Sequence, residues 1–166
     1  MKNKHFLFIL MLLYSFTIAQ VELGIDSIEK LGSDDIIKNC TYCEEITQYE
    51  ITFYIENPND DVAGFQFSLL PEGLFEFSKD NISKGESENA GFTIYAGKGT
   101  VLGFSMIGNV IPANKDRQIL FKLRTSLKDL VQFDEYEINL TNLVLASKKG
   151  ETLKSEFVPY QISKIK

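Results

Sequence analysis

The segment Val62-Ala-Gly-Phe-Gln-Phe-Ser-Leu-Leu70 is the most informative part of this sequence. Its large apolar residues Phe65, Phe67 and Leu69 alternate with the polar residues Gln66 and Ser68. Because successive side chains of a β-strand point to opposite faces, this alternation predicts a strand with one apolar and one polar face. Such strands must bury their apolar faces against one another, which predicts two packed sheets.

Strands of the same kind are predicted along most of the chain, and no helical pattern rivals them in length. Their expected ranges are 21–28, 49–56, 62–70, 74–77, 91–96, 100–108, 118–124, 136–145 and 156–162. The polar segments 29–45 and 78–90 are expected to be loops. Inward positions are expected for Leu102, Phe104 and Met106, and for Ile119, Phe121 and Leu123. The predicted fold class is all-β, a two-sheet antiparallel β-sandwich.

The first 19 residues have the features of a signal peptide. A basic segment, residues 1–5, precedes the apolar run 6–13, which is too short to span a bilayer. Cleavage is expected after Ala19, with cleavage after Gln20 or an uncleaved anchor as alternatives. The predicted organisation is therefore a signal peptide over 1–19 and one domain over 20–166. The domain is expected to be secreted, extracellular or attached to the cell surface, without insertion into the membrane after cleavage.

The charge balance is acidic and argues against several kinds of partner and reaction. The formal net charge is −6, and cleavage would remove Lys2, Lys4 and the sole histidine, His5. An acidic chain without a basic block repels nucleic acid and anionic lipid, so neither is an expected partner. Without a histidine, the domain lacks the general base of a Ser–His–Asp hydrolase. No enzyme activity and no cofactor are predicted.

Two short motifs contain residue types that are used for redox chemistry or metal binding. Cys40-Thr-Tyr-Cys43 is flanked by acidic, loop-like sequence, which does not favour a reactive thiol. A zinc site needs further ligands that the domain does not supply, so a local disulfide between Cys40 and Cys43 is the prediction. Asn57-Pro-Asn-Asp-Asp61 offers oxygen ligands, but without the spacing and glycine of an EF-hand it predicts a turn. No metal site is predicted.

Several blocks of the sequence, taken in order, resemble the cohesin family. The blocks are Val62-Ala-Gly-Phe-Gln-Phe67, Gly91-Phe-Thr-Ile94, Val101-Leu-Gly-Phe-Ser105, Gly108-Asn-Val-Ile-Pro112, Leu120-Phe-Lys-Leu123 and Ile138-Asn-Leu-Thr-Asn-Leu-Val-Leu-Ala-Ser147. The resemblance covers nearly the whole domain, from Val21 to about Ile162. It implies a jelly-roll sandwich like that of carbohydrate-binding modules. The loop 29–45 with its cysteine pair departs from the usual pattern.

The resemblance also implies a function, because cohesins bind dockerin modules and so attach enzymes to scaffolds or cell surfaces. The family's contact surface is the outer face of the sheet that contains the strands matching 62–70, 91–96 and 100–108. Carried over to this chain, the outward partner-binding candidates are Gln66, Ser68, Thr93, Tyr95, Ser105 and Ile107. The implied function is a non-catalytic module of polysaccharide-degrading or cell-surface assemblies.

Two other functions stay open at this point. A carbohydrate-binding module would grip a polysaccharide with exposed aromatic rings, and Tyr54 and Tyr95 occupy outward strand positions. The chain has no tryptophan, the ring most often used for sugar stacking, which favours a protein partner over a glycan. The other alternative is a structural or adhesion subunit in which an edge strand pairs with a neighbouring molecule.

Overall fold

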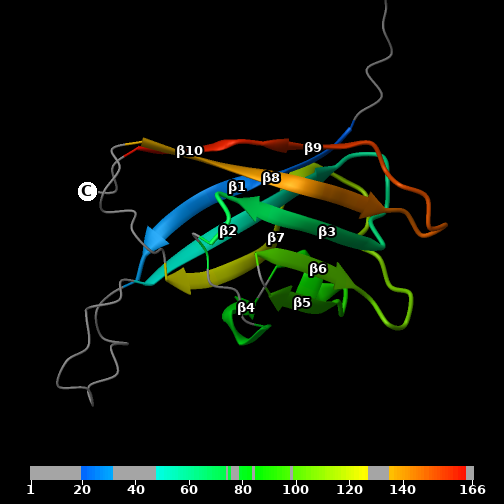
Figure 1. The fold of residues 1–166 in the computed structure, drawn as a ribbon. Coiled ribbons are helices and arrows are strands. Elements are labelled where there is room, and N and C mark those ends of the chain that lie inside the picture. Colours follow the sequence, from blue (N-terminus) through cyan, green and yellow to red (C-terminus); the bar gives the residue numbers. More distant parts are fainter. Residues whose placement is uncertain are drawn as a thin grey trace, which may run out of the picture.

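A computed structural model describes residues 20–31, 48–73, 75, 79–83, 85–97, 99–126 and 135–163. The predicted signal peptide, residues 1–19, and both cysteines, Cys40 and Cys43, lie outside these ranges. Two five-stranded sheets pack face to face (Figure 1). The prediction of an all-β sandwich is confirmed. No helix in the described part of the chain is long and apolar enough to cross a membrane.

Strands far apart in the sequence are neighbours in both sheets. The order in the first sheet is β4 (Ile82–Ser83), β7 (Asn114–Ser126), β2 (Gln48–Asn57), β1 (Val21–Lys30) and β9 (Ser155–Val158). The order in the second sheet is β10 (Tyr160–Ser163), β8 (Glu135–Ala146), β3 (Gly64–Leu70), β6 (Thr100–Phe104) and β5 (Thr93–Gly97). All neighbours are antiparallel except β1 and β9, which are parallel.

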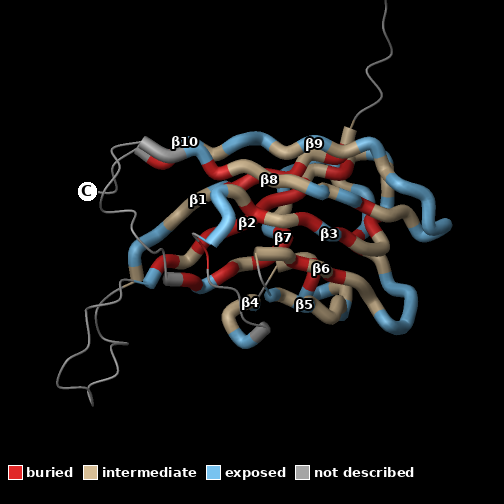
Figure 2. Tube along the Cα trace, in the orientation of Figure 1, coloured by how far each residue is buried: buried red, intermediate tan, exposed pale blue. Residues whose placement is uncertain are grey.

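The buried residues lie between the two sheets (Figure 2). The largest fully buried side chains among them are phenylalanine rings. The rings of Phe53 on β2 and Phe121 on β7 stack with centroids 4.7 Å apart. Phe65 and Phe67 on β3 complete the cluster from the second sheet, at 5.8 and 6.2 Å from Phe121. Phe65, Phe67 and Leu69 are buried while Gln66 is exposed, so the alternation predicted for β3 is confirmed.

The facing predicted for β6 is wrong. In the structure Val101 and Gly103 point into the core, and Leu102 and Phe104 point out, opposite Gln66 and Gly64 of β3. A Cβ atom on residue 103 would overlap the ring of Phe65, so only glycine fits beneath that ring. Met106 lies beyond the end of β6 and is exposed.

The inward position predicted for Ile119 on β7 is also wrong. The register of β2 and β7 shifts between Phe53, opposite Phe121, and Tyr54, opposite Ile119, which leaves Leu120 as an extra residue. Such a β-bulge changes the phase of a strand. Leu120 and Phe121 are both fully buried as a result, and Ile119 is exposed.

The segment 78–90 was expected to be a surface loop, and its described residues contain more structure than that. It holds a turn of 3-10 helix, η3 (Lys79–Asn81), the edge strand β4 and a short helix, α2 (Glu86–Asn89). Ser87 is fully buried and donates a hydrogen bond of 2.6 Å to the carbonyl oxygen of Leu120 at the bulge. This buried serine holds the polar segment against β7.

The two sides of the sandwich are closed differently. The segment 156–162, predicted as one strand, is divided at Pro159 into β9 and β10, which belong to opposite sheets. Together they run along one side of the sandwich, at the top of Figure 1. On the other side the edge strands are β4 and β5, which follow one another in the chain with the short helix α2 between them.

Candidate functional site

The strand register places the outward side chains of the second sheet in rows that cross four strands. The middle row is Val144 on β8, Gln66 on β3, Leu102 on β6 and Tyr95 on β5. A second row is Ala146, Gly64, Phe104 and Thr93, and a third is Thr141, Ser68, Thr100 and Gly97. Because directly opposite residues share a face of the sheet, these rows form one surface, the outer face of the second sheet.

Four of these side chains form an apolar patch: Tyr95, Leu102, Phe104 and Val144. The rings of Tyr95 and Phe104 stack across neighbouring strands with centroids 6.0 Å apart and an interplanar angle of 19°. Tyr95 is 52% exposed and Val144 is 42% exposed. Polar side chains border the patch, among them Ser68 and Thr100, whose hydroxyl oxygens are 2.9 Å apart. The patch thus combines aromatic and aliphatic surface with hydroxyl groups.

At one end of this surface the chain leaves β6 in a tight turn. Ser105 does not continue the strand, and its Oγ accepts hydrogen bonds from the backbone N–H groups of Ile107 (3.4 Å) and Asn109 (3.2 Å). This turn exposes Met106 (73%) and Ile107 (81%) next to the end of the strand that carries Phe104. Ser105 therefore shapes the turn, whereas Met106 and Ile107 extend the apolar surface.

The structure brings together four of the six residues predicted for partner binding. Gln66, Ser68, Thr93 and Tyr95 all lie on the outer face of the second sheet. Ser105 and Ile107 lie in the turn at its end rather than on β6. Sequence reasoning missed Leu102, Phe104 and Val144. Gly103 was the available signal for the first two, because a glycine inside a strand often marks the close approach of another group.

The outward positions of β3, β6 and β5 carry no charged residue. On β8, Glu137 is a charged side chain at the start of the strand, where Gln161 of β10 donates a hydrogen bond to it. The patch is thus surrounded by neutral positions on the three strands that carry most of it. Depletion of charge around an aromatic cluster is typical of the centre of a protein–protein interface.

The opposite, outer face of the first sheet is covered by ion pairs. Arg117 lies 2.8 Å from Glu56 and within 4 Å of Glu22 and Asp26. Glu50 pairs with Lys122 at 2.6 Å and with Arg124 at 3.3 Å. The hydrogen bond from Lys122 holds the pKa of Glu50 below its ordinary value, and the hydrogen bond to Glu56 raises the pKa of Arg117. This face presents paired charges rather than an apolar surface.

Tyr54, predicted to be exposed and to stack on a sugar, lies within this charged face and is only 3% exposed. Its hydroxyl donates a hydrogen bond of 2.7 Å to Glu22, and the guanidinium of Arg117 lies 3.7 Å above its ring. Burial and the hydrogen bond to Glu22 raise the pKa of Tyr54. The ring also packs against Gly24, where a Cβ atom would overlap it. The prediction for Tyr54 is wrong, because no ring face is open to a ligand.

Tyr95 keeps an exposed ring, but it lies on the second sheet, so Tyr54 and Tyr95 do not form a common platform. In the part of the chain that the structure describes, no three His, Cys, Asp or Glu residues lie close enough together to hold a metal ion. The outer face of the second sheet is therefore the candidate site, and it offers contact surface rather than reactive groups.

No family model and no curated protein sequence matches this chain. Its similarity is to solved structures of cohesins. A non-cellulosomal cohesin from the hyperthermophilic archaeon Archaeoglobus fulgidus matches with a TM-score of 0.56 and 11% identity, over 87% of this chain and 91% of that chain. A chain of a type I cohesin–dockerin complex from Clostridium thermocellum matches with a TM-score of 0.55 and 11% identity, over 87% and 99% of the two chains.

The seventh ScaB type I cohesin from Pseudobacteroides cellulosolvens matches with a TM-score of 0.54 and 13% identity, over 87% of this chain and 91% of that chain. These matches cover nearly the full length of both chains, so they concern the whole sandwich and not one motif. The chain has the cohesin fold, and the resemblance predicted from the ordered sequence blocks is confirmed at the level of the fold.

Proposed function

We propose that this protein is a non-catalytic recognition module that binds a dockerin-type protein partner through the outer face of its second sheet. The observation that carries the proposal is the apolar patch of Tyr95, Leu102, Phe104 and Val144 among the neutral outward positions of β3, β6 and β5. The cohesin fold supports the choice of partner, since a solved structure with this fold is a cohesin–dockerin complex. Fold alone does not fix function, so the patch is the stronger support.

The geometry of the patch fits the usual anatomy of a binding surface. Aromatic residues near the centre of an interface contribute most of the binding energy when a partner excludes water from them. Tyr95 and Phe104 are held in place by their mutual stacking, so little side-chain freedom remains to be lost on binding. Gln66, Ser68, Thr93 and Thr100 supply hydrogen-bonding groups beside them. A partner with an apolar centre and neutral polar groups around it is expected.

The proposed setting is extracellular, with residues 1–19 acting as the signal peptide.

Direct binding of a polysaccharide is the second function to test, and it is less favoured because Tyr95 would have to act without Tyr54. An isolated tyrosine beside a phenylalanine gives a short platform for a sugar chain. A protein partner can use the whole face, including Met106 and Ile107 at its end.

The proposal is tested by affinity capture. Residues 20–166 are immobilised and exposed to the secreted fraction of the source organism, and the same protein is run through a gel that contains insoluble polysaccharide. Capture of a protein with a dockerin module, together with unretarded migration in the gel, is the expected result. Retardation by the polysaccharide with no captured dockerin protein would contradict the proposal and favour the glycan-binding function.

A further inference from the structure

We infer that the outer edge of β5, beside which the described residues place no further strand, binds an extended segment of another protein chain, which joins the second sheet as an added strand. The segment would place apolar side chains in a pocket beside β5 and a basic residue near α2. This site lies on the side of the sandwich formed by β4 and β5 and borders the outer face of the second sheet, to which β5 contributes Thr93 and Tyr95. It uses the backbone groups of the strand edge, so the inference does not depend on the function proposed above.

The register of the β5–β6 hairpin shows which backbone groups point to the free edge. Gly97 pairs with Thr100 across a two-residue connection, and in such a hairpin the closing pair exchanges both of its hydrogen bonds. Hydrogen-bonded pairs alternate along an antiparallel ladder, so Tyr95 and Thr93 also bond to β6. The N–H and C=O groups of Ile94 and Ala96 consequently point away from the sheet.

The hydrogen bond of Phe92 supports this assignment of the edge groups. Phe92 lies two residues before Ile94, so its N–H should also point away from β6. It donates a hydrogen bond of 2.8 Å to the carbonyl oxygen of Ser87, outside the sheet. One edge group is thus already satisfied by α2. Ile94 and Ala96, two and four residues further along, offer their groups to an added strand at the spacing that a β-ladder requires.

β5 lacks the features that protect the other edges in the described part of the sandwich. β4 has only two residues, β9 and β10 have four each and are separated by Pro159, and β9 also carries Glu156. Short length, charge and proline all discourage an incoming strand. β5 reads Thr-Ile-Tyr-Ala-Gly, five residues without charge or proline. An unprotected edge of this kind is a template for strand addition.

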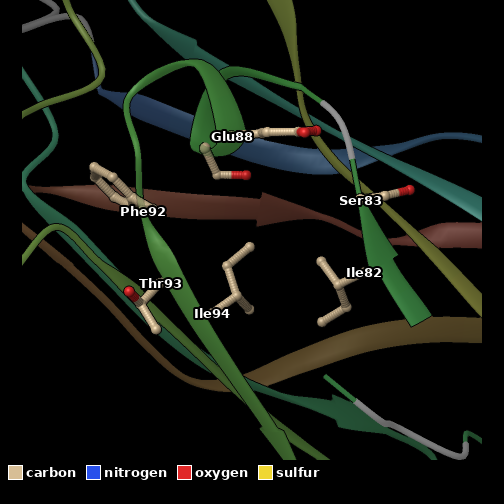
Figure 3. Close-up of a pocket in the computed structure, with 7 residues that line it drawn as sticks. Ile82, Ser83, Glu88, Phe92, Thr93 and Ile94 are labelled. Atoms are coloured by element: carbon tan, nitrogen blue, oxygen red, sulfur yellow. The ribbon is translucent and has the colours of Figure 1, made fainter. Parts of the chain in front are cut away.

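A pocket of about 390 Å³ lies beside this edge (Figure 3). Ile94 of β5 and Ile82 of β4 line it from opposite sheets, and Phe92 lines it next to α2. All three side chains pack against the core and form the apolar part of the pocket, while Ser83, Ser87, Glu88 and Thr93 line the rest. An added strand would turn every second side chain toward the interior of the sandwich, and this pocket is where those side chains would lie.

The charge of α2 indicates the end groups of the segment. This helix carries Glu86 and Glu88 and no basic residue, and Glu88 is among the residues that line the pocket. Glu86 already accepts a hydrogen bond from Asn89, and an ionised carboxylate can accept several. A lysine or arginine at the end of the segment beside Thr93 would add a favourable interaction with this negative charge. The occupant is therefore an extended peptide with apolar residues at alternate positions and a basic residue at that end.

The probe is a synthetic nonapeptide of alternating valine and threonine with lysine at both ends, titrated into the purified protein and followed by amide NMR. The largest shifts are expected at Ile94 and Ala96. In an extended peptide the N–H groups of every second residue point to the same edge, so N-methylation of alternate residues removes the donors of one edge of the peptide. Two methylated peptides are compared with the parent, one for each alternate set of residues, so that each lacks the donors of a different edge. At least one of the two is expected to bind at least tenfold more weakly than the parent peptide.

Two further comparisons test the charge and the edge. Replacing both lysines of the peptide by glutamate is expected to weaken binding severalfold. Ala96→Pro removes the N–H that points to the free edge and is expected to abolish the shifts, with dockerin-type binding retained. Shifts confined to residues away from β5, or equal binding of the parent and both methylated peptides, would overturn the inference. The peptide comparisons leave the protein unchanged, so they decide the matter even if Ala96→Pro does not fold.

Discussion

Leu102→Arg is expected to weaken the binding of a dockerin-type partner at least 100-fold. Leu102 lies in the middle row of the outer face of the second sheet, between Gln66 and Tyr95. An arginine there would have to lose its water without gaining a carboxylate from this face, and it would separate the partner from the rings of Tyr95 and Phe104. A 100-fold loss corresponds to about 2.7 kcal/mol, the size of effect found at the centre of interfaces.

The matched control is Ile119→Arg. Ile119 is an exposed apolar residue on the outer side of the first sheet, opposite Tyr54 in the register, so the same substitution is made on the other face. Calorimetric titration of the captured partner should give a wild-type dissociation constant for this variant. Thermal unfolding should show that both variants are folded. Equal affinities of Leu102→Arg and Ile119→Arg would mean that the partner binds elsewhere.

Gly103→Val is expected to lower the free energy of unfolding by about 3 kcal/mol. The added side chain would enter the space that the ring of Phe65 fills. This ring cannot move aside easily, because it is buried and stacks with Phe67, Phe92 and Phe121. The expected decrease in melting temperature is about 6–12 °C for a domain of this size.

Gly97→Val is the control for this prediction. Gly97 lies on the neighbouring strand β5, has ordinary backbone geometry, and a Cβ atom there would meet nothing within 4 Å. Valine favours strand conformation, so this variant should be at least as stable as the wild type. Urea denaturation of the two variants gives the comparison. If they are equally stable, the packing of Phe65 on Gly103 does not control the facing of β6.

The sequence pattern was sufficient to predict the strands whose alternation is uninterrupted. Phe65, Phe67 and Leu69 on β3 are buried as their spacing predicted, and Ile51, Phe53 and Ile55, which alternate in the same way on β2, are buried too. The pattern failed where a local feature changed the phase. On β6 two large apolar residues flank a glycine, and their size suggested that they were the inward residues. In the structure the ring of Phe65 leaves no room for a Cβ atom at the inward position, so Gly103 occupies it.

On β7 the cause of the error was different. Ile119, Phe121 and Leu123 alternate perfectly, but the bulge at Leu120 inserts an extra inward residue that no periodicity can reveal. The bulge is held by Ser87 and Gly85, which approach the carbonyl groups of residues 119 and 120 from a distant segment. Such a long-range contact has no signature in the strand itself.

For the candidate site too, the sequence predicted the residues on strands with regular alternation and missed those on β6. Gln66, Ser68, Thr93 and Tyr95 were assigned to the outer face because β3 and β5 keep their phase. The apolar patch was not foreseen, since Leu102 and Phe104 were assigned to the core. The error for Tyr54 came from reading an outward position as an exposed one. Arg117, 63 residues further along the chain, covers that ring.

The most direct test of the central claim is a methyl NMR footprint of the complex with the captured partner. Unlabelled partner is added to protein labelled at its isoleucine, leucine and valine methyl groups. We expect the signals of Leu102, Val144 and Ile107 to shift or broaden, while those of Ile119 on the opposite sheet stay unchanged. Perturbation of Ile119 with unaltered signals from Leu102 and Val144 would contradict the assignment of the outer face of the second sheet as the binding surface.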